Sequence, residues 1–259
     1  MELAQLFSGF AVGVIVGITG VGGGSLMTPL LVLLFGIAPA AAVGTDLLYA
    51  AITKAGGTAV HAQRGNVEWR IVGLLAAGSL PAALLTLFCV ARLAPAGFSS
   101  TGRIITIALG IALLLTAVAL IFRHRLQAWG QAHGAAALLP GPRAAWTVVT
   151  GGALGSLVAL SSVGAGALGV TALFMLYSRL PAIRIVGTDL AHAVPLTLVA
   201  GIGHWWLGHI DWPLLGTLLL GSIPGILIGS HFAQRIPDRI LRPALAGMLV
   251  LVGAKLIAV

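Results

Sequence analysis

The strongest constraint on this chain is a succession of apolar runs that polar residues interrupt only briefly. A helix of about 20 apolar residues crosses a bilayer whose hydrocarbon core is roughly 30 Å thick. Because backbone groups in lipid must be paired within the structure, each run is expected to be helical. The ten runs lie near residues 4–20, 24–36, 40–61, 69–91, 103–122, 145–161, 165–178, 182–207, 213–233 and 239–258. The sequence therefore predicts an all-α integral membrane protein with several passes.

The composition supports this class and argues against a soluble enzyme. Only 8% of the 259 residues are charged and 59% are hydrophobic, whereas a soluble domain carries about 25% charged residues. The net charge of +8 comes from scattered basic residues, without the patch that nucleic-acid binding requires. The single cysteine, Cys89, cannot form an intrachain disulfide or a cysteine-based metal site. We expect no metal, no cofactor and no nucleic-acid partner.

The chain contains an internal duplication. Residues 43–47 (VGTDL) recur as 186–190, and 14 of the 39 positions in 43–81 are identical to those in 186–224 at an offset of 143. The longest polar interruption, 123–143, separates the two copies. We expect a first transmembrane repeat at 1–122, a cytoplasmic linker at 123–143 and a second transmembrane repeat at 144–259.

Each copy opens with a glycine-containing break, 20–25 (GVGGGS) and 161–166 (SSVGAG). The segments that follow extend only about 20 Å at 1.5 Å per residue, which is short for a span. A half-helix pair plus about three full transmembrane helices gives each repeat an odd number of crossings, so the second repeat is inverted. This topology places ten of the fourteen basic residues on one side, as the positive-inside rule describes for the cytoplasm. The breaks are either re-entrant hairpins or tilted spans.

Inverted repeats with interrupted helices are typical of secondary transporters, whose substrate binds where the breaks meet near the bilayer midplane. The N–H groups that begin the second half-helix attract anions, and glycine lets an anion approach the backbone closely. The alternative for the glycines is close helix packing, and that for Lys54 is snorkelling toward the interface. The predicted anion-binding residues are Gly22, Gly23, Gly24, Ser25, Thr28, Lys54, Ser161, Ser162, Gly164 and Gly166.

Two aspartates and one histidine are candidates for proton coupling. Asp46 and Asp189 are repeat equivalents within apolar runs, where a charge costs roughly 2.5–3.5 kcal/mol on insertion scales. His61 has the equivalent His204, and histidine titrates near neutral pH. The alternatives are helix capping or structural pairing for the aspartates and hydrogen bonding at the membrane interface for the histidines.

These motifs together resemble those of the sulfite exporter TauE/SafE family of membrane transporters. The resemblance rests on 17–24 (GITGVGGG) with 29–31 (PLL), on 42–46 (AVGTD), on 65–69 (GNVEW), and on the second-copy segments 163–166 (VGAG) and 186–189 (VGTD). It implies a secondary transporter that exports small sulfur-containing oxyanions, such as sulfite, sulfoacetate or related organosulfonates, across the bacterial inner membrane.

Other functions remain as alternatives to this exporter. A passive anion channel and an importer of another small anion are the nearest. An intramembrane enzyme is disfavoured because no Ser–His pair, His-Glu-x-x-His motif or Gly-x-Gly-Asp motif is present. The expected partners are the small anion, the lipid bilayer and protons as a coupling ion. A homo-oligomer is left open.

Overall fold

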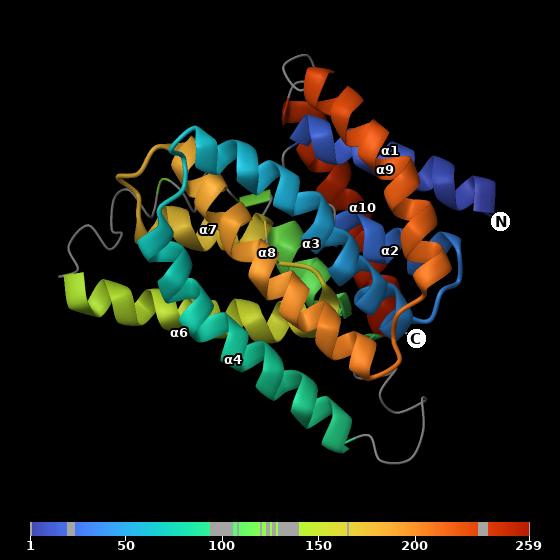
Figure 1. The fold of residues 1–259 in the computed structure, drawn as a ribbon, viewed down its shortest axis with the longest axis horizontal. Helices are drawn as coiled ribbons and strands as arrows, with labels where there is room; N and C mark the ends of the chain where they lie inside the picture. Colours follow the sequence, from blue (N-terminus) through green and yellow to red (C-terminus); the bar gives the residue numbers. More distant parts are fainter. Residues whose placement is uncertain are drawn as a thin grey trace.

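The computed structural model describes residues 2–19, 24–93, 106–107, 109–119, 121–122, 125, 128, 140–164, 166–232 and 238–258. Within these ranges the chain is helical and contains no β-strand, which confirms the expected all-α class. A further short helix, Leu109–Ala119, lies between α4 and α6 in the sequence. The labelled helices (Figure 1) are α1 (Glu2–Thr19), α2 (Gly24–Leu34), α3 (Pro39–Gln63), α4 (Trp69–Leu93), α6 (Pro140–Ser161), α7 (Ala167–Leu176), α8 (Ala182–Trp206), α9 (Trp212–Phe232) and α10 (Asp238–Ala258).

The outer surface of the bundle is apolar, as expected of helices that contact lipid. Among the described residues, three helical stretches are long and apolar enough to cross a bilayer, namely Trp69–Arg92, Pro142–Ser161 and Ala182–Trp206. Large apolar side chains are exposed on several helices, including Leu84, Leu85 and Phe88 on α4, Ile202 on α8, and Leu220 and Ile223 on α9. An exposed apolar surface of this extent favours a membrane protein over a soluble one.

Helices α3 and α8 run through the middle of the bundle, with α4 and α6 together on one side and α1 and α9 on the other (Figure 1). The two central helices are antiparallel. Gly44 near the start of α3 packs against His204 and the His209 backbone after α8. Gly187 near the start of α8 packs in the same way against His61 and the Asn66 backbone after α3.

Glycines bring the outer helices into direct backbone contact with their partners. The contacts join Gly9 to Leu218 and Gly13 to Ser222 between α1 and α9, and Gly151 to Leu75 and Gly155 to Ser79 between α6 and α4. A side chain at any of these glycines would overlap the partner's carbonyl oxygen. Close packing, one of the two interpretations offered for the glycines, is therefore the role of these four.

The two central helices end in matching turns. Gly65 (φ 68°) and Gly208 (φ 76°) adopt the left-handed conformation, which glycine accepts without strain. The loops that follow are held by the threonines of the VGTD motifs. Thr188 Oγ1 accepts from Glu68 N at 3.0 Å, and Thr45 Oγ1 accepts from Asp211 N at 3.1 Å.

Candidate functional site

Seven polar side chains gather inside this apolar bundle, where α2, α3, α4, α8 and the connection between α6 and α7 meet. Each is at most 4% exposed. We call them the central polar cluster: Thr28, Asp46, Lys54, Ser79, Ser162, Asp189 and His192. Buried polar groups are normally hydrogen-bonded, so the partners of each group indicate which atoms remain available to a ligand.

Asp46 occupies the α3 side of the cluster. Thr28 Oγ1, from α2, donates a hydrogen bond to Asp46 Oδ2, and Ser162 adjoins the same carboxyl group. The second carboxylate oxygen, Oδ1, and the Ser162 hydroxyl are buried and have no hydrogen-bond partner among the described residues. A buried polar atom without a partner costs about 1–3 kcal/mol, which makes these two atoms candidate ligand contacts.

Asp189 occupies the α8 side. Its Oδ1 faces Gly169 in the first turn of α7, so closely that a Cβ on this glycine would overlap the oxygen. In the part of the chain that the structure describes, this oxygen also lacks a hydrogen-bond partner. The first turn of a helix favours negative charge, and the close approach of α7 depends on glycine at position 169.

His192 lies one turn beyond Asp189 on α8 and completes the second side. Its Nε2 is 2.8 Å from Ser79 Oγ on α4, while its Nδ1 has no hydrogen-bond partner within the described ranges. Sequence reasoning missed both His192 and Ser79. The expectation that the chain contains no Ser–His pair, which was used to disfavour an intramembrane enzyme, is therefore wrong. The three-residue spacing from Asp189, which places both side chains on one helix face, could have found His192.

Lys54 supplies the positive charge of the cluster. It lies two turns after Asp46 on α3, and its ammonium interacts electrostatically with Asp189 and Asp46 and with His192. At 4% exposure Lys54 is enclosed by the bundle, so the snorkelling alternative is wrong. Two carboxyl groups from different halves of the chain therefore face one cation.

The aspartates are not helix caps. Each is the eighth residue of its helix, since α3 begins at Pro39 and α8 at Ala182. The N-cap positions are Ala38 and Pro181, which make no side-chain capping bond. The capping alternative is therefore wrong, and the aspartates lie well inside the central helices.

The repeat equivalents of the cluster differ in two chemically important positions. Tyr49 stands at the position equivalent to His192, and Thr197 at the position equivalent to Lys54. Tyr49 adjoins Ser222, much as His192 contacts Ser79. The scaffold is thus duplicated, whereas the lysine and the histidine each occur in only one copy.

The break residues of the second repeat adopt unusual backbone conformations. Ser162 (φ 57°), Gly164 (φ 122°) and Gly166 (φ 130°) all have positive φ in the short connection from α6 to α7. Ser161 lies beside them, but its hydroxyl donates to Leu157 O of its own helix at 2.7 Å. Of the two adjacent serines, only Ser162 adjoins Asp46.

In the first repeat, Gly22 and Gly23 lie outside the described residues, while Gly24 and Ser25 begin α2. The structure does not bring His61 into the cluster, because it lies in the last turn of α3 against Gly187. Its equivalent His204 bonds Ala159 O through Nε2 at 2.8 Å. Among the described residues, no group of three His, Cys, Asp or Glu side chains could hold a metal ion.

Comparison with known proteins identifies the family. Residues 5–256 match the family model described as "Sulfite exporter TauE/SafE". The chain belongs to the TauE/SafE family. The resemblance inferred from the glycine and VGTD motifs is thereby confirmed over nearly the whole length.

Relatives of this TauE/SafE protein carry matching names. It is 40% identical over 257 residues to "Probable membrane transporter protein YjnA" of Bacillus subtilis (strain 168), covering 99% of this chain and 100% of that protein. It is 29% identical over 252 residues to "Probable membrane transporter protein YdhB" of the same strain, covering 93% and 97%. A "Probable membrane transporter protein" of Xylella fastidiosa (strain 9a5c) is 25% identical over 235 residues, covering 90% and 85%. No solved structure matches the chain significantly. The TauE/SafE protein is therefore a multi-pass membrane transporter.

Proposed function

We propose that this transporter exports a small sulfur-containing oxyanion, such as sulfite, sulfoacetate or a related organosulfonate, across the bacterial inner membrane. The family description names sulfite export. The central polar cluster is the proposed binding site, with the two glycine-containing breaks contributing hydroxyl and backbone N–H groups. The protein acts in this proposal as a carrier and not as an enzyme.

The observation that carries the proposal is the buried ammonium of Lys54. A charge inside the membrane is expensive and usually marks a substrate or ion pathway. The duplicated scaffold does not need a cation at this position, because the equivalent residue is Thr197. We assign Lys54 the role of the fixed positive charge that attracts the anion.

Charge balance at the cluster links anion binding to protonation. With Asp46 and Asp189 both ionised beside Lys54, an anion 4 Å from one carboxylate is repelled by about 4 kcal/mol at an effective dielectric constant of 20. Protonation of one carboxyl removes that repulsion, so proton and anion favour each other's binding. Asp46 and Asp189 are the proposed proton carriers, and His61 would act only on the path to them.

The other proposed ligands lie at the breaks. Hydroxyl and N–H groups there would replace the hydration shell of the anion, as in other transporters with discontinuous helices. The positive φ angles at Ser162, Gly164 and Gly166 turn the chain so that the first turn of α7 approaches Asp189. The complete set is Gly22, Gly23, Gly24, Ser25, Thr28, Ser161, Ser162, Gly164 and Gly166.

We further infer that 1–122 and 144–259 are inverted-topology repeats, joined by a cytoplasmic linker at 123–143. Three observations support this inference. The equivalent helices α3 and α8 are antiparallel, and the α1–α9 glycine contacts recur between α6 and α4 at offsets of 142 and 143. Gly110 and Gly253, which are 143 residues apart, lie against each other's backbone, as equivalent residues do beside a two-fold axis. In this proposed architecture, the glycine-containing break of each repeat separates a pair of half-helices.

The test is sulfite flux in proteoliposomes that contain the purified protein. Saturable flux above that of empty vesicles, with accumulation against a gradient when a membrane potential is imposed, supports the carrier. Flux that neither saturates nor accumulates would identify a passive anion channel. No flux of sulfite or of the organosulfonates, combined with flux of another solute, would refute the substrate assignment.

A further inference from the structure

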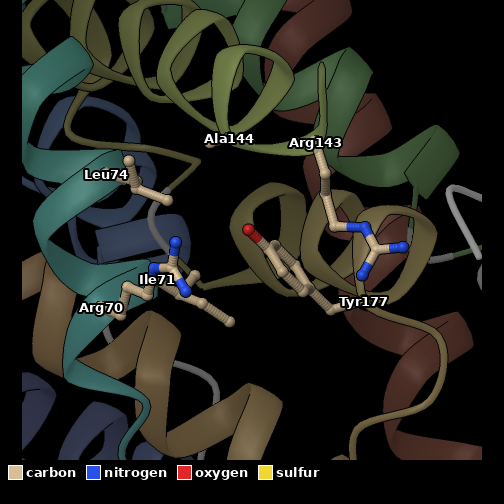
Figure 2. Close-up of a pocket in the computed structure, with 6 residues that line it drawn as sticks. All are labelled: Arg70, Ile71, Leu74, Arg143, Ala144 and Tyr177. Carbon is tan, nitrogen blue, oxygen red and sulfur yellow. The ribbon is translucent and has the colours of Figure 1, made fainter. Parts of the chain in front are cut away.

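A second polar site lies away from the central cluster, where α4, α6 and the segment after α7 meet. A pocket of about 120 Å³ is lined by Arg70, Ile71, Leu74, Arg143, Ala144 and Tyr177. A neighbouring pocket of about 130 Å³ shares Arg143 and Tyr177 and adds Arg179. Figure 2 shows the side chains of Arg70 and Arg143 on the two sides of the Tyr177 ring. Among the described residues that line the two pockets, none is acidic.

A chain of contacts holds this site in shape. Thr147 Oγ1 donates to Arg143 O at 2.8 Å and lies 2.8 Å from the Tyr177 hydroxyl. Because the threonine proton is already used, the tyrosine must be the donor in the second bond. The fixed Tyr177 ring lies 5.9 Å from the Arg143 guanidinium, within cation–π range. The ring contact therefore favours this orientation of the guanidinium before any ligand binds.

The acidic residue beside this region does not neutralise the pocket. Glu68, two positions before Arg70, bonds instead to Arg184 at 2.6 Å. The N-terminal ends of α4 and α6 also lie here, and helix N-termini favour anions. Guanidinium groups and helix N-termini thus present positive charge to the same space.

The site occurs on only one face of the duplicated scaffold. The positions equivalent to Arg70, Tyr177 and Arg179 are Pro213, Phe35 and Ile37. The positive-inside rule accounts for arginines on this face, but it does not require a guanidinium packed on a tyrosine whose hydroxyl is fixed. The geometry therefore indicates that these arginines bind a ligand in addition to setting the orientation of the helices in the membrane.

We propose that Arg70, Arg143 and Arg179 form a binding site for an oxyanion of the phosphate or sulfate type, distinct from the central polar cluster. On this measure of volume, a cavity of about 10–15 Å³ holds one water, so the pocket of about 120 Å³ accommodates an oxyanion group. Two sources supply this chemistry at a membrane surface, a free anion in the cytosol and the phosphate of an anionic lipid headgroup. The planar guanidinium of arginine can bind either of these anions through its N–H donors.

The test uses the full chain in nanodiscs and compares the wild type with an Arg70→Gln/Arg143→Gln double variant. Arg92→Gln is the control, because Arg92 is exposed at the other end of α4. Equilibrium dialysis against sulfate in phosphatidylcholine discs measures the free anion. Enrichment of phosphatidylglycerol around the protein in mixed discs measures the lipid. We expect the double variant to lose roughly tenfold in one of these two measurements, which identifies the source, and the control to lose neither.

Unchanged sulfate affinity and unchanged lipid enrichment in the double variant, each to within about twofold, would overturn the proposal. If that variant does not fold, the single variant Arg70→Gln, at an exposed position, replaces it in the test. Its binding of sulfate or enrichment of lipid is expected to fall about threefold. Lys54→Thr separates this result from the proposed function. Binding at the arginines survives that substitution, whereas binding at the central cluster does not.

Discussion

Lys54 on α3 interacts electrostatically with Asp189 on α8, so the buried charges of the two halves of the chain meet at one place. Asp46 joins them from the same helix as the lysine. In the proposed function, charges enclosed in this way both connect the central helices and bind the anion. The predictions that follow separate these two contributions.

Lys54→Met is expected to destabilise the folded protein by about 3–5 kcal/mol, because it leaves buried carboxylates without their cation. Adding Asp189→Asn removes one of those charges and is expected to recover about 1–3 kcal/mol of the loss. Thermal unfolding of the purified variants in one detergent measures both effects. If the Lys54→Met variant is as stable as the wild type, the lysine does not balance the charge of these carboxyl groups.

Gly169→Ala is expected to reduce transport about tenfold, because the new methyl group overlaps the position of Asp189 Oδ1 and displaces the carboxyl. Gly216→Ala in α9 is the matched control, since no atom lies near its added Cβ. The control should be neutral or gain up to about 1 kcal/mol of stability. Equal transport rates for the two variants would contradict the role assigned to the α7 contact.

Thr188→Val and Thr45→Val are each expected to cost about 1–3 kcal/mol of stability, because each removes the acceptor for a backbone N–H that follows a central helix. Thr217→Val is the control, since Thr217 is partly exposed and bonds Pro213 O of its own helix. Thermal unfolding checks all three. Markedly different costs for the two motif threonines would show that the two loops are not equivalent.

Acid is expected to destabilise the protein in part through His209. Burial lowers the pKa of His209 from its ordinary value of 6.5, and its Nδ1 lies 3.1 Å from His204 Nδ1. The unfolded chain therefore binds the proton more tightly, so this contribution is present above about pH 6.5 and declines as the pH falls below that value. His209→Asn installs the residue found at the equivalent position 66 and should flatten the stability profile over this range. An unaltered profile would exclude His209 as its source.

The helical class, the duplication and most members of the central cluster were predictable from the sequence. Asp46, Lys54 and Asp189 stand out because charge is rare in apolar runs, and Thr28 and Ser162 because they adjoin the breaks. These signals are local, so a single sequence suffices to find them.

The remaining members depend on contacts between distant segments. Ser79 meets His192 across 113 residues, and no sequence pattern pairs them. Ser161 and Ser162 look equivalent in the sequence, but the left-handed backbone of Ser162 (φ 57°) separates their environments. Likewise, the sequence does not distinguish glycines that break a helix from glycines that pack helices together. The packing role of Gly9 and Gly151 follows only from the structure, where each lies against a carbonyl oxygen of the partner helix.

The most direct test of the central claim is the initial rate of sulfite flux in proteoliposomes with wild-type protein, Lys54→Thr and Lys255→Gln. Position 54 then carries the residue of its repeat equivalent, and Lys255 is an exposed lysine near the end of α10. Losing a buried charge partner typically costs 2–5 kcal/mol, so Lys54→Thr should transport about a hundredfold more slowly while Lys255→Gln matches the wild type. Wild-type flux in the folded Lys54→Thr variant would contradict the account.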